Sequence, residues 1–292
     1  MSTRVLSLHG VRLGNAKILP LLALYIVFFL IPQVYFLRMA FYQPGLYGQV
    51  NGPIGLTTIT DVLTSNFYLG AIWRTVQLCG LSAGISLLLA YPVAYLIVRF
   101  RRLGGILFIL VAATMFSSAV ARVLGWRVLL ADNGPVKDLL SILGVADSTL
   151  DMSNNFTAVV IGTVHAILPI VIIGLMPVCQ QVPQDHVLAA RSLGGSEWTT
   201  FFRIYFPQTI NGCVAVGLLA FATTAGAFTT PVLLGGGRVG VLSILMYSDA
   251  TSALNYPRAA VLAGILFVLV LLTVAVSLGY TRLNLRRRER TR

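Results

Sequence analysis

The sequence is poor in charged side chains, and poorest in acidic ones. Only 10% of its 292 residues are charged and only 9 are Asp or Glu, whereas a soluble domain carries about 25% charged residues. With 57% hydrophobic residues and a mean hydropathy of +0.86, this shortage excludes an ordinary soluble domain. The cysteines are few and odd in number, Cys79, Cys179 and Cys213, without metal-ligand spacing. We interpret them as packing residues.

The groups that carry out chemistry are also missing. No stretch matches the phosphate loop G-x-x-x-x-G-K-[ST]. The three histidines, His9, His165 and His186, are scattered, and neither a Ser–His–Asp nor a Cys–His arrangement is recognisable. We therefore expect no catalytic residue, no metal ion and no cofactor bound by this chain, and a membrane-embedded enzyme is the least supported class.

Long apolar runs are what the sequence has in abundance. We identify six, each long enough to span a bilayer as a helix, at residues 18–36, 76–98, 103–124, 156–178, 212–234 and 259–280. They lack the alternation of a lipid-facing barrel strand, so helices are favoured. The predicted fold class is an all-α polytopic membrane protein with six transmembrane helices. We expect one transmembrane domain over residues 1–292, in which a tail and a first span at residues 18–36 precede core spans at about 69–280.

The distribution of basic residues predicts the orientation. Most Lys and Arg residues fall in segments that are cytoplasmic if the N-terminus is, and most acids fall on the other side. The positive-inside rule therefore predicts a multi-pass membrane protein with both termini in the cytoplasm. The basic residues at 282–292 are interpreted as a topology anchor that contacts anionic lipid, not as a nucleic-acid arm.

A polar insert of residues 180–211 separates the fourth and fifth runs. Loops longer than about 12–15 residues are usually functional or disordered, and this one is too rich in helix formers, aromatics and caps to be disordered. It could rest on lipid headgroups as an interfacial helix. The interpretation we favour is a cytoplasmic helix that docks into a groove of a separate partner.

Turn residues divide the insert into two short helices. Asp185 can cap the first helix, and Gly194 with Gly195 can end it because glycine adopts a positive φ at no steric cost. Ser196 can cap the second, which we expect to end at Pro207.

Within the insert, residues 188–207 read LAARSLGGSEWTTFFRIYFP. This segment resembles the signature loop E-A-A-x3-G-x9-I-x-L-P of binding-protein-dependent ABC importer permeases. The residues that match the signature at its spacing are Ala189, Ala190, Gly194, Ile204 and Pro207. Leu188 replaces the signature's Glu, and Phe206 replaces its Leu. Further stretches at 74–75, 91–95, 126–134 and 230–237 look most like the spermidine/putrescine branch.

The resemblance implies a type I ABC importer fold in the plasma (bacterial inner) membrane, with a cytoplasmic coupling helix. It also implies a second permease, expected to be a different chain, an external solute-binding protein, and two ATP-binding cassette subunits that carry ATP and magnesium. The residues implied to dock the ATPase are Asp185, Leu188, Ala189, Ala190, Leu193, Gly194, Gly195, Ile204 and Pro207. The implied solute is polyamine-like, although opines, phosphonates and ferric ion stay open.

Polar residues within or beside the spans are candidates for the solute pathway, because polar side chains are costly in lipid. They are Ser117, Ser118, His165, Thr223, Thr224, Tyr247 and Asp249. The hydroxyls could equally form helix–helix hydrogen bonds. Asp249 could hold a cationic solute at the external mouth or be an ordinary loop residue.

A stand-alone secondary transporter or channel is the alternative function. Such proteins usually show ionisable pairs within the membrane or inverted repeats with broken helices. Neither is visible in the sequence.

Overall fold

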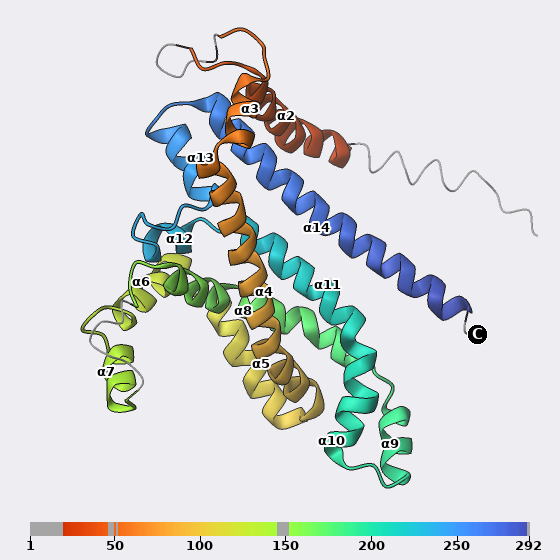
Figure 1. Ribbon diagram of the computed structural model, residues 1–292. Coiled ribbons are helices and arrows are strands. Elements are labelled where there is room, and N and C mark those ends of the chain that lie inside the picture. The colour runs from red at the N-terminus through yellow and green to blue at the C-terminus, as the bar shows by residue number, and fades with distance from the viewer. Residues whose placement is uncertain (1–19, 46–49, 51, 145–151, 291–292) are drawn as a thin grey trace, which may run out of the picture. The chain divides into compact units, whose positions relative to one another are not determined.

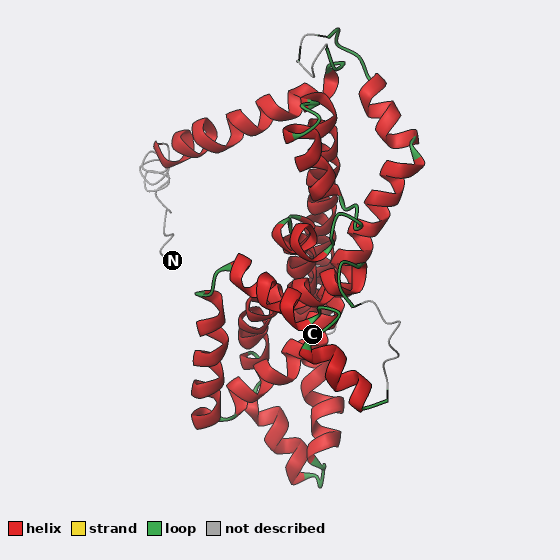
Figure 2. Cartoon of the chain, turned by 90° about the vertical axis from the view of Figure 1, so that its left-hand side faces the viewer, coloured by secondary structure: helices red, strands yellow, loops and turns green. Residues whose placement is uncertain are grey.

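The computed structural model describes residues 20–45, 50, 52–144 and 152–290 of the chain. Figure 2 shows helices and loops in this part and no strand; an isolated antiparallel bridge joins Tyr42 to Ile54. The expected all-α class is thus confirmed for the described residues. The chain groups into two compact units, Met1–Ser65 with Met246–Gly264, and Asn66–Leu245 with Ile265–Arg292. The single permease domain stays a prediction.

Unit 1 contains the first candidate span. Its helices are η1 (Ile26–Leu30), α2 (Ile31–Arg38), η2 (Met39–Phe41) and α3 (Thr57–Thr64). The first three belong to a 22-residue helical run, Pro20–Phe41, whose most apolar window is 0% buried within the chain. A helix that is apolar all round and uncovered by its own chain fits a lipid or partner surface.

Unit 2 contains most of the remaining helices, drawn from orange to blue in Figure 1. They are α4 (Asn66–Arg99), α5 (Arg101–Met115), α6 (Ala119–Leu129), α7 (Pro135–Ile142), α8 (Phe156–Gln180), α9 (Gln184–Ser192), α10 (Glu197–Thr200), η4 (Phe201–Tyr205), α11 (Phe206–Ala225) and α12 (Thr229–Leu234). The division between the units runs through α13 (Leu242–Thr251) and α14 (Tyr256–Arg290).

Small side chains hold the core of unit 2 together. Ala90 and Ala94 of α4 are fully buried in a cluster that includes Leu175 of α8. Small residues let helix backbones approach closely, which is the main way that membrane helices gain packing energy. Helix α11 approaches α8 closely in the same way. A Cβ added to Gly212 of α11 would stand 2.3 Å from Cγ1 of Val178 on α8.

Five helices of the described residues are long and apolar enough to cross a membrane, or six if one bent pair counts as a span. Three expected spans, the second, fourth and sixth, fall within α4, α8 and α14. The third expected span, 103–124, is not one helix: α5 and α6 meet at 98°. The backbone tightens there into i→i−3 bonds, from Phe116 N to Ala113 O (3.2 Å) and from Ser117 N to Thr114 O (3.3 Å).

The expected ends of the fifth span are also corrected. The insert's second helix does not stop at Pro207, because α10, η4 and α11 follow one another without a break and form the candidate span Glu197–Ala225. Pro207 lies in the first turn of α11, after a π-turn in which Phe206 N bonds to Phe201 O, and a proline is tolerated in such a first turn. The span ends at Ala225, so residues 229–234 form the separate helix α12.

Candidate functional site

The insert forms a compact turn of two helices beyond the end of α8. Helices α9 and α10 lie side by side at one end of unit 2 (Figure 1). The turn is a Schellman motif: Gly194 has φ +83°, its N–H donates to Arg191 O (2.9 Å), and Gly195 N–H donates to Ala190 O (3.0 Å). The two glycines therefore end the helix as predicted.

One of the two predicted caps is confirmed and the other is wrong. The Ser196 hydroxyl accepts a hydrogen bond from Thr199 N at 3.2 Å, as a capping residue does. The N-cap of α9 is Pro183, whereas Asp185 lies inside the first turn. Its carboxylate there still favours the positive end of the helix dipole. Because Pro183 takes the extended backbone of the cap position, Asp185 lies two residues after the cap, at the second helical position.

The turn leaves large apolar side chains uncovered. Leu188 is 58% exposed, Leu193 89% and Trp198 75%, and none of the residues of α9 is buried. An ion pair between Arg191 Nη2 and Glu197 Oε1 (2.7 Å) joins α9 to α10, but exposed pairs contribute little to stability. Exposed apolar residues gathered on a rigid turn are typical of a surface that a partner covers.

The predicted docking set is divided in space. Asp185, Leu188 and Leu193 belong to the α9 turn, together with Ala189, Ala190 and the two glycines. Ile204 lies in η4 and Pro207 in α11. These last two residues therefore belong to the helix that leads from the turn into the membrane, not to the turn itself.

The base of the turn is fastened by tyrosines that the sequence analysis missed. The Tyr205 hydroxyl donates to the Cys179 carbonyl oxygen near the end of α8 (2.8 Å). The hydroxyls of Tyr91, on α4, and Thr209, on α11, are 2.8 Å apart. The aromatic run at 201–206, FFRIYF, was the available signal. These bonds connect the turn to three membrane helices.

Aromatic rings continue this connection. The ring of Tyr95 meets those of Phe201 and Tyr205 edge to face, with centroids 5.1 and 5.0 Å apart, and Tyr91 packs in the same way on Phe206 (5.4 Å). Beside them lies an apolar groove of about 850 Å³ between α4 and the α10–α11 segment. Edge-to-face pairs contribute about 0.5–1.5 kcal/mol each beyond their buried area.

The candidate pathway residues are scattered rather than gathered at one site. His165 packs edge to face on Trp126 of α6, with ring centroids 5.6 Å apart. Ser117 and Ser118 lie exposed at the bend between α5 and α6. Thr223 and Thr224 each donate to the Ala220 carbonyl of their own helix (2.9 Å). The threonine bonds are therefore within one helix, not between helices.

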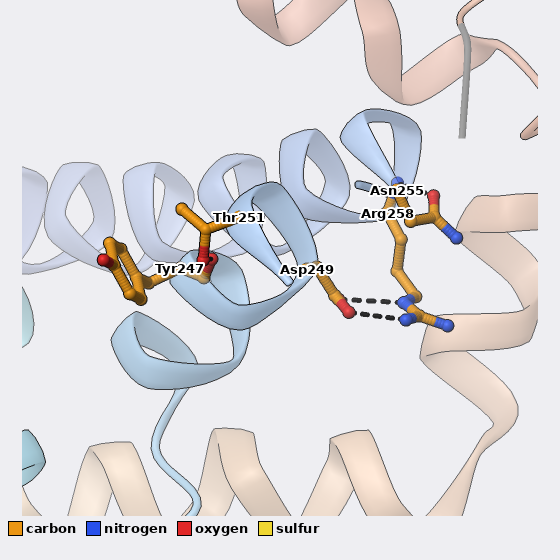
Figure 3. Close-up of polar contacts among 5 residues, drawn as sticks. All are labelled: Tyr247, Asp249, Thr251, Asn255 and Arg258. Carbon is orange, nitrogen blue, oxygen red and sulfur yellow. Dashed lines mark hydrogen bonds and ion pairs between the residues drawn. The ribbon is translucent and has the colours of Figure 1, made fainter. Parts of the chain in front are cut away.

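Asp249 is engaged within its own unit. Figure 3 shows its carboxylate facing Arg258, whose Nε and Nη2 donate to the two carboxylate oxygens at 2.8 and 2.5 Å. Asp249 is only 7% exposed, and its carbonyl oxygen also accepts from Asn255 N (2.7 Å). Tyr247 points away from the pair in Figure 3. The structure thus places Asp249 in an ion pair between α13 and α14, where it does not face an open mouth.

No group of three or more His, Cys, Asp or Glu residues able to hold a metal ion occurs among the residues that the structure describes.

Apolar helices of membrane-spanning length, with a rigid turn projecting between two of them, are the features of a multi-pass membrane protein. Residues 85–289 match the family described as the binding-protein-dependent transport system inner membrane component, and the chain belongs to this family. It is 28% identical over 260 residues to the spermidine/putrescine transport system permease protein PotB of Haemophilus influenzae, covering 89% of this chain and 90% of that protein. It is 28% identical over 202 residues to the molybdenum transport system permease protein ModB of Azotobacter vinelandii, covering 67% and 86%.

The fold is also that of solved transporters. A chain of a bacterial alginate ABC transporter, crystallised with an alginate pentasaccharide-bound periplasmic protein, superposes with a TM-score of 0.72 at 19% identity, covering 91% of this chain and 92% of that one. The protein is therefore a permease subunit of a binding-protein-dependent ABC importer, a transport component rather than an enzyme. The type I importer fold and the family predicted from residues 188–207 are confirmed.

Proposed function

We propose that this chain and a second, different permease together form the pathway of an importer whose solute is delivered by an external binding protein. ATP and magnesium are bound by two ATPase subunits, which act on this chain from the cytoplasm. The observation that carries the proposal is the exposed α9 turn, because its apolar residues need a cover that the described chain does not provide. Both termini then lie in the cytoplasm, on the side of the turn, and the whole chain serves as one permease domain.

The turn acts as the coupling element. Leu188, Leu193 and the small residues Ala189 and Ala190 enter a cleft of the ATPase, a helix-in-groove contact. Closure of the ATPase subunits moves the turn as a rigid body, since the Schellman motif fixes its shape. Gly194 and Gly195 thus fix the shape of the α9 turn that the ATPase subunits move.

Movement of the turn reaches the membrane by two routes. The chain itself connects α9 to α8 and α10 to α11. The Tyr205–Cys179 bond and the ring contacts of Tyr91 and Tyr95 add α4. Ile204 in η4 and Pro207 in α11 lie on the continuous helical segment that leads from α10 into the membrane, where they transmit the movement rather than bind the ATPase.

The solute is polyamine-like, and this part of the proposal is supported by the likeness to the spermidine/putrescine permease. His165, Ser117, Ser118, Thr223 and Tyr247 are the candidate pathway residues, whereas Thr224 is buried. Because Arg258 already neutralises Asp249, we infer that the carboxylates that select a cationic solute belong to the binding protein or to the second permease.

The test is spermidine uptake into proteoliposomes that contain the complete transporter, with ATP and the binding protein supplied. Leu193→Asp is expected to lower both uptake and co-purification of the ATPase at least tenfold, because it places a charge in a desolvated contact. The matched control is Leu143→Asp, which changes another exposed leucine (64%) just after α7 and should behave as wild type.

Unchanged uptake by Leu193→Asp would show that the α9 turn does not dock the ATPase. Uptake by the purified chain alone, driven by a proton or sodium gradient without ATP, would instead favour a stand-alone secondary transporter.

A further inference from the structure

A polar recess lies in unit 2 at the opposite end of α8 from the α9 turn. It has a volume of about 400 Å³ and is lined by Arg74 and Gln77 of α4, Asn154 and Asn155 before α8, and Arg238 after α12. Helix α8 has 25 residues, and a rise of 1.5 Å per residue separates its ends by roughly 37 Å. This length exceeds the thickness of the hydrocarbon core. The recess and the docking turn therefore belong to opposite faces of the membrane.

The walls of the recess are fixed by close backbone contacts. Asn154 has φ +56° and Gly236 has φ +54°, and a Cβ added to Gly236 would stand 2.6 Å from the Cβ of Asn154. The side chain of Asn155 caps α8 by accepting a hydrogen bond from Ala158 N (2.8 Å). The two loops thus meet directly, and a positive φ at a residue other than glycine indicates that the surroundings hold it in place.

The chemistry of the lining is that of an anion site. Arg74 and Arg238 bring two guanidinium groups, Gln77, Asn154 and Asn155 bring amides, and the other described lining residues are Phe156 and Val239. No acid lines the recess among the described residues. Guanidinium groups match carboxylate oxygens in geometry and charge. A polyamine would be repelled here, so the recess is not the binding place of the solute proposed above.

We propose that this recess receives a carboxylate side chain of the external solute-binding protein and thereby positions that protein over the permease. The inference rests on the proposed function, since it needs a binding protein that arrives at the face opposite the ATPase. Arg74 is the anchor: its side chain is exposed, and its Nη1 lies 3.5 Å from the position that a Cβ on Gly240 would take. A complementary charge at such a contact accelerates and orients docking.

The test uses the complete transporter in proteoliposomes and measures ATP hydrolysis while the binding protein is titrated. With Arg74→Glu, the concentration of binding protein that gives half-maximal stimulation is expected to rise about tenfold at low salt, while the maximal and basal rates stay unchanged. The difference from wild type should shrink at high salt, because salt screens exposed charges. Arg74→Lys should restore most of the wild-type behaviour.

The matched control is Arg127→Glu, which reverses another exposed charge beside a neighbouring small pocket. If both reversals weaken stimulation equally, or if Arg74→Glu has no effect, the recess is not the docking point. A comparison of acetate with chloride at equal ionic strength separates the sources of the carboxylate. Acetate is expected to weaken stimulation in wild type but not in Arg74→Glu, because it competes with the binding protein's side chain for Arg74. A change of ATP hydrolysis by acetate in the absence of binding protein, lost in Arg74→Glu, would instead assign the recess to free anions and overturn the proposal. If the wild-type transporter shows no stimulation at all, the proposed function fails, not this inference alone.

Discussion

Tyr205→Phe, at the base of the α9 turn, is the most informative single change. The carbonyl of Cys179 would normally accept a helical hydrogen bond from the N–H of residue 183, but that residue is Pro183 and has no N–H. The Tyr205 hydroxyl supplies the missing donor at 2.8 Å, and Cys179 is only 2% exposed. Phenylalanine keeps the ring packed on Tyr95 while it removes the donor.

The size of the effect follows from what the carbonyl loses. A buried polar group left without a partner costs about 1–3 kcal/mol, whereas hydrogen bonds between membrane helices average about 0.6 kcal/mol. We therefore expect Tyr205→Phe to weaken the attachment of the turn to α8 by about 1 kcal/mol, which is roughly a fivefold change in the population of the detached turn. Because a detached turn can move without moving α8, more ATP should be hydrolysed for each solute transported.

The assay is the ratio of ATP hydrolysed to solute taken up, measured with the thermal stability of the complete transporter. Tyr95→Phe is the matched control, since it removes a hydroxyl from the same ring cluster without removing a hydrogen bond to the residues that the structure describes. A severalfold higher ratio for Tyr205→Phe alone is expected. Equal ratios for both variants and wild type would refute the idea that this bond transmits movement.

Three further changes test the geometry. Gly194→Ala should weaken ATPase association by about 1–2 kcal/mol, because φ +83° is strained for alanine; Gly144→Ala, at φ +68° after α7, should lower stability without affecting association. Gly212→Val should lower the melting temperature through an overpacking cost of about 1–3 kcal/mol, and an unchanged melting temperature would show that α8 and α11 can separate. Arg258→Gln should be more destabilising than the double variant that also carries Asp249→Asn, because the single change leaves a buried carboxylate unpaired; the reverse order of melting temperatures would contradict this.

The class of protein could be predicted from the sequence because its determinants are local. Apolar runs of membrane length fix the helices regardless of what they pack on, and the glycines at 194 and 195 fix a turn through their own backbone freedom. The match of residues 188–207 to the permease signature depends only on spacing. These features needed no partner element, and the structure agrees with the second, fourth and sixth runs and with the glycine turn.

The remaining features depend on contacts between segments far apart in the chain. Composition cannot distinguish a straight third span from α5 and α6 bent at 98°, since both contain the same apolar residues. The donor to the Cys179 carbonyl comes from a residue 26 positions later, and the carboxylate of Asp249 is satisfied by Arg258 on the next helix. Periodicity and spacing report which face a residue occupies on its own element. Only the tertiary structure decided which partner that face meets, and therefore which polar groups were already satisfied and which surfaces remained for other proteins.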